Sequence, residues 1–339
     1  MRILVVTDTW APQINGVVRT YQNLRRHAAQ RNIEIDVMSF NQFSSIPCPT
    51  YKELRLVITK PSLIEKQLLK ADPKYVHVAT EGPLGALAKI ALNRVGIQYT
   101  SSYHTRFPEY VTKRFFIGGT ATRTWQRYFH NSSIGTMVRS PILRVELARH
   151  QFNRLMPWVG GVDTRLFRPR TQRIFGRRAP VFLYVGRLAV EKNIDAFLRL
   201  SLPGLKVLVG DGPAKARLER RYPEAVFCGT KTDEDLANCY ASADVFVFPS
   251  TTDTYGLTML EAMATGIPVA AHPVAGPLDI VVHGRSGFLD WDLQKACLAS
   301  LDLNRESVRS TVLDYTWENC LTGFFQNIES ANTGHAAKT

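Results

Sequence analysis

The stretch ADVFVFPSTTDTYGLTMLEAMATGIPVAA, residues 243–271, contains a strand, a loop, a helix and the start of another strand. Its first apolar run ends at Phe248, and a short polar loop follows. Apolar residues then recur at helical spacing from about Gly256. Gly266 ends that helix, and Pro268 opens the next apolar run. This order predicts a parallel β-α-β unit, the building block of doubly wound α/β folds.

The same alternation occurs twice along the chain. The apolar runs are Ile3–Val6, Ile35–Ser39, Tyr75–Val78 and Gln98–Tyr103 in the first half, and Val181–Val185, Leu205–Val209, Val226–Cys228, Val245–Phe248 and Pro268–His272 in the second. Continuous apolar strands between helices indicate parallel sheets that are covered on both faces. We therefore predict two Rossmann-like doubly wound domains facing each other across a cleft, where the chemistry is expected.

An Arg-, Pro- and Gly-rich segment, residues 161–180, separates the two series and predicts a linker. The expected domains cover residues 1–165 and 166–315. Residues 316–339 form a C-terminal helix and tail that can pack back on the first domain. The length of 339 residues agrees with more than one hydrophobic core.

Composition excludes several classes of protein. No apolar run approaches the roughly 18 residues of a membrane span, and the opening MRILVVTDTW is too short for a signal peptide. Five scattered cysteines without a C-x-x-C pair indicate reduced thiols in the cytoplasm. The first turn, TDTWAPQINGVVRT, lacks G-x-G-x-x-G, which disfavours a dinucleotide oxidoreductase.

The net charge of +13 is concentrated in one stretch. Between Arg94 and Arg178 there are 16 Lys and Arg residues against three acidic ones, and the rest of the chain is neutral. Such a cluster attracts phosphate groups of nucleic acids or of anionic lipids. A merely solubilising surface is the alternative.

Residues around the predicted helix start at Gly256 suit a diphosphate ligand. The amides of Gly256–Thr258 are unpaired by helix geometry and lie at the positive end of the helix dipole. Glu261 shares a helix face with Leu257 and Thr258, where its carboxylate could accept from ribose hydroxyls. Asp253 could hold hydroxyls of a donor sugar. Alternatively, Glu261 is an exposed helix residue and Asp253 a capping residue.

YVGRLAVEKNI, residues 184–194, supplies two cations after a predicted strand. Arg187 and Lys192 beside a diphosphate would neutralise the charge that builds on a leaving group.

Together these segments resemble the retaining glycosyltransferases of family GT4, which have the GT-B fold. The family signature has two acidic residues separated by seven others, here Asp253 and Glu261, although its first position is more often Glu. The resemblance implies sugar contacts for Asp253, ribose contacts for Glu261 and leaving-group stabilisation by Arg187 and Lys192. The other implied donor-binding residues are Gly16, Gly186, Asp211, Gly229, Lys231, Tyr255, Gly256, Leu257 and Thr258.

SSYHTRFPEYV, residues 101–111, places His104 at the end of a predicted strand. The segment resembles the region of lipid-directed and mannosyl GT4 enzymes whose His contacts the donor sugar, and this role is implied for His104. A lone structural histidine is the alternative. Glu109 is a candidate for the acceptor site. Arg139 stands where many relatives carry a small hydroxyl residue.

KRFFIGGTATRTWQRYFH, residues 113–130, alternates cations with aromatic residues. The pattern suits an anionic lipid surface, but bases of single-stranded nucleic acid could stack on the same rings, or the rings could be core. Because the chain also carries the glycosyltransferase signature, a membrane is favoured as the partner of this segment, and no nucleic acid is expected. The candidate residues are Lys113, Arg114, Phe115, Phe116, Arg123, Trp125 and Arg127.

The resemblance predicts a retaining hexosyltransferase without metal or cofactor, peripheral on the cytoplasmic face of a bacterial inner membrane. Its donor would be UDP-glucose or UDP-glucuronate rather than GDP-mannose, and its acceptor a membrane lipid such as diacylglycerol, joined by an α-linkage. Asp290-Trp291-Asp292 has the form of a metal-binding D-x-D but is expected to face solvent. A soluble saccharide acceptor, a sugar-nucleotide epimerase and a catalytically silent binding module are the alternatives.

Overall fold

Two compact units make up the protein. The computed structural model describes residues 1–13, 15–48, 51–104, 119–176 and 179–336. Unit 1 comprises Met1–Gly160 and Trp317–Thr339, and unit 2 comprises Gly161–Thr316. The observed division after Gly160 precedes the expected one at residue 165. Val162 belongs to unit 2, since its N–H donates to the carbonyl of Tyr315 at 2.8 Å.

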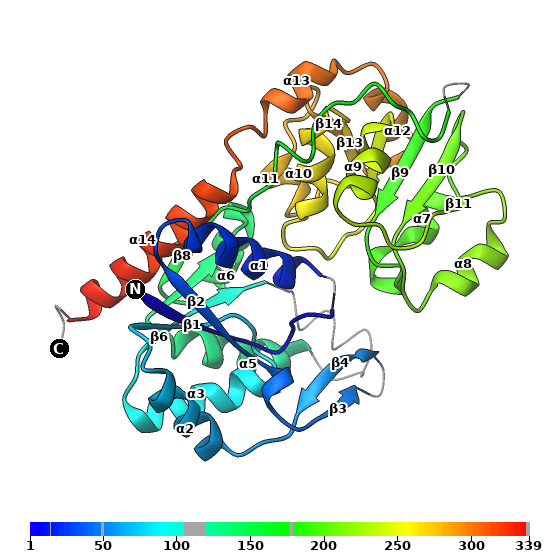
Figure 1. Ribbon diagram of the computed structural model, residues 1–339. Helices are drawn as coiled ribbons and strands as arrows, with labels where there is room; N and C mark the ends of the chain where they lie inside the picture. Colours follow the sequence, from blue (N-terminus) through cyan, green and yellow to red (C-terminus); the bar gives the residue numbers. More distant parts are fainter. Residues whose placement is uncertain (14, 49–50, 105–118, 177–178, 337–339) are drawn as a thin grey trace. The chain divides into compact units, whose positions relative to one another are not determined.

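Unit 1 contains a six-stranded parallel sheet with the order β2-β1-β5-β6-β7-β8. Its strands are β1 (Arg2–Thr7), β2 (Glu34–Ser39), β5 (Tyr75–Val78), β6 (Tyr99–Tyr103), β7 (Gly135–Val138) and β8 (Leu155–Pro157). Its helices are α1 (Gly16–Ala29), α2 (Pro61–Ala71), α3 (Pro83–Val95), α5 (Gly119–Asn131), α6 (Pro141–Arg149) and α14 (Trp317–Ala336), which lie on the two faces of the sheet (Figure 1). A hairpin of β3 (Ser45–Cys48) and β4 (Tyr51–Val57) and a 3-10 turn, η1 (Phe40–Gln42), complete the unit.

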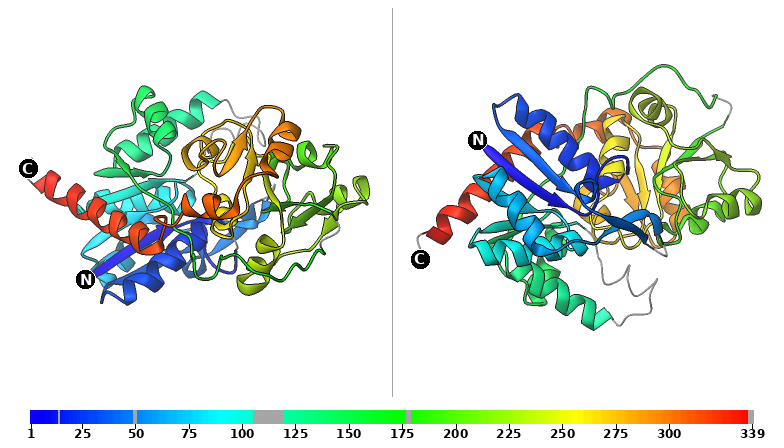
Figure 2. Two further views of the ribbon diagram at one scale, coloured as in Figure 1. Left: turned by 90° about the horizontal axis from the view of Figure 1, so that it is seen from above. Right: turned by 60° about the horizontal axis from the view of Figure 1, so that its bottom comes forward.

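The C-terminal helix α14 returns to unit 1 and packs against α1 (Figure 2). The sequence predicts a helix over 315–330, and the observed helix runs on to Ala336. Leu321, Phe324 and Ile328 lie on one helix face and are fully buried. This apolar face makes the last helix part of the core of the first unit.

Unit 2 repeats the plan, with the parallel strand order β11-β10-β9-β12-β13-β14. Its strands are β9 (Val181–Val185), β10 (Leu205–Val209), β11 (Val226–Phe227), β12 (Val245–Phe248), β13 (Val269–Ala271) and β14 (Gly287–Leu289). Its helices are α7 (Ile194–Leu198), α8 (Lys215–Arg221), α9 (Asp233–Ala241), α10 (Leu257–Ala264), α11 (Pro277–Ile280), α12 (Leu293–Ser300), α13 (Arg305–Ser310) and the 3-10 turn η2 (Val190–Lys192).

Alternate residues of β9 serve two different cores in unit 2. Leu183 packs in the cluster that includes Leu260 of α10, whereas Phe182 and Tyr184 pack in the cluster that includes Leu218 of α8. Both faces of the sheet are therefore apolar and covered, which explains why β9 reads as a continuous apolar run. The predicted doubly wound α/β fold is confirmed in both units.

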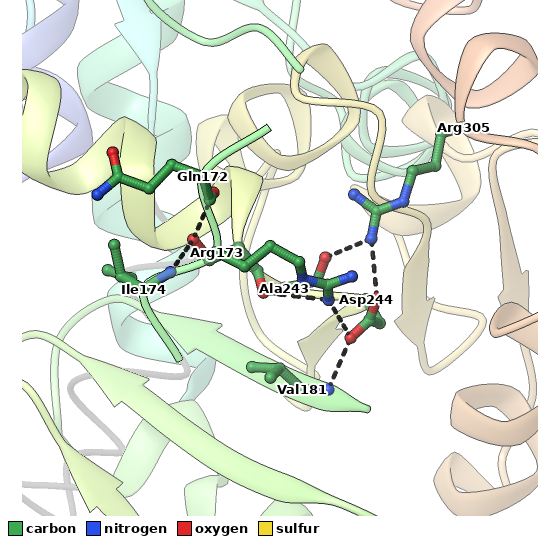
Figure 3. A network of polar contacts seen from close by, with 8 residues as sticks. Gln172, Arg173, Ile174, Val181, Ala243, Asp244 and Arg305 are labelled. Carbon is green, nitrogen blue, oxygen red and sulfur yellow. Dashed lines mark hydrogen bonds and ion pairs between the residues drawn. The ribbon is translucent and has the colours of Figure 1, made fainter. Parts of the chain in front are cut away.

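The Arg-rich segment before β9 is fixed to unit 2 by Asp244 (Figure 3). Its carboxylate accepts from Arg173 at 2.5 Å, from Arg305 at 2.9 Å and from the backbone N–H of Val181 at 2.9 Å. Part of the cationic stretch is thus neutralised inside the fold. Because Val181 begins β9 and Asp244 precedes β12, this cluster lies at the amino ends of the strands.

Candidate active site

The strand order of unit 2 brings two distant loops together. The chain passes from β9 to β10 and β11, then crosses back to place β12 on the other side of β9. This reversal is the switch point at which doubly wound sheets bind ligands, at the carboxyl ends of the strands. Lys192 follows β9 and Asp253 follows β12, and their side chains form an ion pair, each about one-fifth exposed. Asn193 also donates to the carbonyl of Pro249 at 3.1 Å, so the loops are held together.

Arg187 lies in the loop that follows β9. Burial lowers the pKa of its guanidinium to about 10, which still leaves the side chain charged at neutral pH. The hydroxyl of Tyr184 donates to the Arg187 carbonyl at 2.8 Å and fixes the loop. A Cβ on Gly210 would lie 2.0 Å from the carbonyl oxygen of Gly186, so glycine lets the loops after β9 and β10 touch. This edge can therefore present a fixed cation to an anionic ligand.

The start of α10 differs from the start of α1. Gly256 is the N-cap of α10, with φ at +100°, and no side chain in the described part of the chain caps the first turn. In α1, by contrast, the side chain of Asn15 accepts from the amides of Val17 and Val18. The first-turn amides of α10 are thus the ones suited to an anion, as helix N-termini commonly are.

Glu261 is buried on α10, at 7% exposure, and its Oε2 accepts from the hydroxyl of Tyr240 at 2.8 Å. This finding rules out an ordinary exposed helix residue. Sequence reasoning missed Tyr240, which comes from α9 and carries no local signal for this contact. The hydroxyl of Tyr240 can therefore hold the carboxylate of Glu261 in one orientation.

The other predicted donor residues occupy varied surroundings. Asp211 is exposed, and its carboxylate accepts from the Gly212 amide at 2.7 Å, as in an ordinary turn. The carbonyl of Gly229 accepts from the Gly210 amide at 2.8 Å, so the loops after β10 and β11 run together. Leu257, Thr258 and Lys231 are half-buried and Tyr255 is buried.

Gly276, which was not among the predicted site residues, adjoins the loop after β12. A Cβ at Gly276 would lie 2.8 Å from the carbonyl oxygen of Tyr255. The turn containing Gly276 therefore packs against the residues that lead into α10. The A-G-P tripeptide at 275–277 was the local signal for a turn there.

In unit 1, His104 follows β6 directly and its Nε2 lies 3.1 Å from the hydroxyl of Tyr21. Burial, followed by the charge of Arg139, lowers the pKa of His104 well below its ordinary value, so its ring is neutral. Arg139 donates to Thr20 Oγ1 at 2.9 Å and lies 4.3 Å above the ring of Trp158. Gly16, the first residue of α1, is exposed.

The predicted membrane segment, residues 113–130, is described from residue 119 onward, and only some of its side chains face the core. Arg123 of α5 is exposed, Trp125 is half-buried against the core, and Phe129 is fully buried. Tyr128 is exposed, and Nζ of Lys89 lies 3.2 Å from the centroid of its ring. The alternative that the rings belong to the core therefore holds for Phe129. The candidates Glu109, Lys113, Arg114, Phe115 and Phe116 lie outside the described residues.

An open groove of about 610 Å³ lies between α5 and the end of α6. Its lining consists of Thr120, Arg123, Thr124, Arg127, Arg149, His150 and Gln151. Arg127 donates to Gln151 Oε1 at 2.8 Å, and Arg123 Nη1 lies 3.4 Å from His150 Nε2. The groove thus combines three guanidinium groups with no carboxylate among these lining residues.

The D-x-D tripeptide faces solvent at Trp291, which is 66% exposed. Asp292 caps α12 by accepting from the amides of Gln294 and Lys295. Within the described ranges, no three or more His, Cys, Asp or Glu side chains gather closely enough to hold a metal ion. Across the same residues, no helix has the length and apolarity needed to cross a bilayer.

Comparison with known proteins places the chain in a family. The model described as "Glycosyltransferase Family 4" matches residues 14–166, and that described as "Glycosyl transferases group 1" matches residues 179–300. A GDP-mannose-dependent alpha-mannosyltransferase of Mycobacterium tuberculosis is 30% identical over 85% of this chain and 83% of that protein. The chain belongs to glycosyltransferase family 4. The predicted GT4 membership is therefore confirmed.

Two further relatives carry other sugars in their names, and the second also names a lipid product. A sulfoquinovosyl transferase of Arabidopsis thaliana is 31% identical over 81% of this chain and 61% of that protein. An alpha-monoglucosyldiacylglycerol synthase of Streptococcus pneumoniae is 26% identical over 94% of this chain and 83% of that protein. This family 4 glycosyltransferase is thus similar to both mannosyl and glycolipid transferases.

Solved structures share the fold. Sucrose-phosphate synthase from Thermosynechococcus elongatus matches with a TM-score of 0.78 at 20% identity, covering 98% of this chain and 99% of that one. Anabaena HepE in complex with UDP-glucose matches with a TM-score of 0.71 at 16% identity, covering 98% and 100%. The predicted GT-B fold class is confirmed.

Proposed function

We propose that this glycosyltransferase moves a hexose, with retention, from a nucleotide-diphosphate sugar to a hydroxyl of a membrane lipid, without a metal. The observation that carries the donor part is the ion pair of Lys192 and Asp253 on neighbouring loops, just before the uncapped start of α10. Cations and free amides at one strand edge suit a diphosphate, and a carboxylate beside them suits sugar hydroxyls.

In this proposal the diphosphate binds the amides at Gly256–Thr258, and Arg187 and Lys192 offset the charge of the leaving group. Glu261, already oriented by Tyr240, accepts from the ribose hydroxyls. The departing diphosphate takes the proton of the acceptor hydroxyl, so no separate base is nominated. His104 remains a predicted sugar contact supplied by unit 1.

The proposal also specifies the nucleotide base and the sugar of the donor. UDP-glucose or UDP-glucuronate is our prediction, and GDP-mannose is the second candidate because the mannosyltransferase relatives carry that donor in their names. Purified protein should hydrolyse one nucleotide sugar from a panel slowly and transfer it faster when lipid acceptor is added. Equal release of free sugar with and without any acceptor would contradict transfer and favour the epimerase alternative.

Arg187→Ala tests the leaving-group role. We expect turnover to fall by roughly a hundredfold or more, the usual loss when one preorganised electrostatic stabiliser is removed. Arg220→Ala, which removes an exposed arginine of α8 in the same unit, is the control and should retain wild-type kcat. Normal turnover by the Arg187 variant would refute the assignment.

For the acceptor side, we propose peripheral binding to anionic lipid on the cytoplasmic face of the membrane, supported by the groove between α5 and α6. Each cation near an anionic surface contributes about 1 kcal/mol, so replacing Arg123, Arg127 and Arg149 by Gln should weaken vesicle binding by roughly a hundredfold. The matched control, with the same loss of charge, replaces the exposed residues Arg25, Arg26 and Lys70.

Flotation with phosphatidylglycerol vesicles at low salt gives the measurement. Binding that both triple variants lose equally would point to net charge alone and remove the groove from the proposal. Absence of binding by the wild-type protein would favour a soluble saccharide acceptor.

A further inference from the structure

The hydroxyl of Tyr21 lies between two imidazole rings in unit 1. Its oxygen is 2.9 Å from Nε2 of His77 and 3.1 Å from Nε2 of His104. Tyr21 and His77 are fully buried, and His104 follows the strand next to that of His77. A continuous chain of polar atoms therefore runs from the interior of the sheet to its carboxyl edge.

The chain continues inward from His77. Nδ1 of His77 lies 2.9 Å from the hydroxyl of Thr100, and Nε2 lies 2.9 Å from that of Ser102. Burial lowers the pKa of His77 to about 3, so this ring is neutral at physiological pH. A neutral imidazole has one N–H donor and one acceptor nitrogen.

The hydroxyl of Tyr21 couples the tautomers of His77 and His104. Tyr21 has a single hydroxyl hydrogen, so it can donate to one of the two Nε2 atoms or to Ser102 Oγ, which lies 3.4 Å away. If it donates to His77, its oxygen accepts from Nε2–H of His104, whose Nδ1 is then unprotonated. If it donates to His104, then Nδ1 of His104 carries the hydrogen. If it donates to Ser102, its oxygen can still accept from Nε2–H of His104, and Nδ1 is again unprotonated. The single hydrogen of Tyr21 thus determines which nitrogen of His104 carries a hydrogen.

Aromatic side chains fix the rings in place. Phe324 of α14 packs edge-on against His77 at 5.0 Å between centroids, and Trp158 lies 5.9 Å from His104. The indole N–H of Trp158 donates to the carbonyl of Cys320 at 3.0 Å. The C-terminal helix thus supports the wall around these rings, and little rotation is left to them.

We propose that Tyr21 and His77 are positioning residues that hold His104 in one tautomer, so that a defined nitrogen, donor or acceptor, meets the sugar. The catalytic consequence rests on the proposed transferase function. The physical reason is that the partner of one ring nitrogen decides which nitrogen carries the hydrogen. A His104 free to exchange tautomers would present the correct nitrogen for only part of the time.

The direct test is ¹⁵N NMR of the full-length protein labelled at histidine, because ring-nitrogen shifts distinguish N–H from unprotonated nitrogen. His104→Gln identifies the His104 signals among the eight histidines. We expect limiting shifts of one tautomer in the wild type and averaged shifts in Tyr21→Phe. Averaged shifts in the wild type, or unchanged shifts in Tyr21→Phe, would overturn the proposal.

The control is Tyr103→Phe, which removes another buried hydroxyl of the same sheet, one that donates to Gln126 at 3.2 Å. It should keep the wild-type His104 shifts. His77→Gln is a second variant that should also average the shifts if Tyr21→Phe fails to fold. Unchanged shifts in His77→Gln would limit the chain to Tyr21 and overturn the role of His77.

Kinetics provide the functional readout. Tyr21→Phe should lower kcat by roughly threefold to tenfold, because the correct tautomer is then populated for only part of the time, while KM for the donor stays close to the wild-type value. An equal loss through KM would indicate damage to donor binding and count against positioning. If the NMR result holds but the wild type transfers no sugar, the positioning role stands and the proposed function fails.

Discussion

At the scale of single residues, three carboxylates that are at least mostly buried have unequal surroundings. Glu261 is bound by a tyrosine hydroxyl, and Asp253 is paired with Lys192. Glu81, which follows β5 in unit 1, is 6% exposed and accepts from the amide of Gln126 at 2.6 Å. Burial raises the pKa of Glu81 to about 7. A group with these properties makes stability depend on pH.

Glu81→Gln should therefore stabilise the protein selectively at high pH. The raised pKa means that the folded state keeps a proton that the unfolded state releases above about 4.5. The protonated Glu81 side chain therefore contributes to the free energy of unfolding at low pH. This contribution is lost as pH rises from about 4.5 to about 7. Between pH 5 and pH 8 we expect the wild type to lose about 2–3 kcal/mol relative to the variant.

Urea unfolding at both pH values measures this difference. Glu329→Gln, which replaces an exposed carboxylate on α14, is the control and should follow the wild type at both pH values. A constant difference between wild type and Glu81→Gln across the range would show that Glu81 titrates normally.

At the scale of elements, the start of α10 depends on backbone conformation. Gly256 has φ at +100°, a region that side-chain-bearing residues rarely adopt. A Cβ there would lie 2.6 Å from the methyl group of Met259 and 3.2 Å from the ring of Phe248. The strand end, the loop and the helix start are therefore a single packed piece.

Gly256→Ala should disturb this piece in two ways. Backbone strain should cost about 1–3 kcal/mol of unfolding free energy, and displaced amides should weaken nucleoside-diphosphate binding. Calorimetric titration with UDP and GDP, beside urea unfolding, measures both effects. Gly284→Ala is the matched control, because Gly284 also has positive φ, at +76°, in unit 2 but nothing within 4 Å of a Cβ.

The two substitutions separate strain from binding. Gly284→Ala should lose stability while keeping wild-type affinity. Equal affinity in Gly256→Ala would argue against the proposed diphosphate site at α10.

At the scale of the whole molecule, the cationic stretch is divided between the units. Arg165, Arg168, Arg170 and Arg173 belong to unit 2, so the excess charge is not confined to unit 1. In unit 2, Arg170 pairs with Glu234 at 2.5 Å and Arg173 with Asp244. The charge that lines the α5–α6 groove is therefore a distinct feature of unit 1.

Because each unit has its own core, a core deletion should act on one unit. Phe324→Ala should lower the unfolding midpoint of unit 1, since truncating a buried Phe typically costs about 3–5 kcal/mol. Trp291 is the single tryptophan of unit 2, so in a Trp291→Phe background tryptophan fluorescence reports on unit 1 alone. Phe246→Ala, the matched deletion in unit 2, should leave that fluorescence midpoint unchanged. Equal shifts would mean that both units unfold as one.

Local patterns predicted most strands of the two sheets but missed β7, β8 and β14. Parallel strands covered on both faces need continuous apolar runs, and such runs are visible in sequence. β7 (GTMV), β8 (LMP) and β14 (GFL) are too short or too mixed to give that signal, and they are held by neighbours in the sheet. The glycine at the start of α10 was likewise visible, because turn chemistry is local.

The sequence alone determined the fold class and the family and predicted the donor-binding residues, because strand periodicity and loop signatures are properties of neighbouring residues. Only tertiary structure decided which distant side chains meet. Tyr21 contacts His77 and His104 across 56 and 83 residues, and Tyr240 contacts Glu261 across 21. Such contacts follow from strand order and helix packing, which no local pattern specifies.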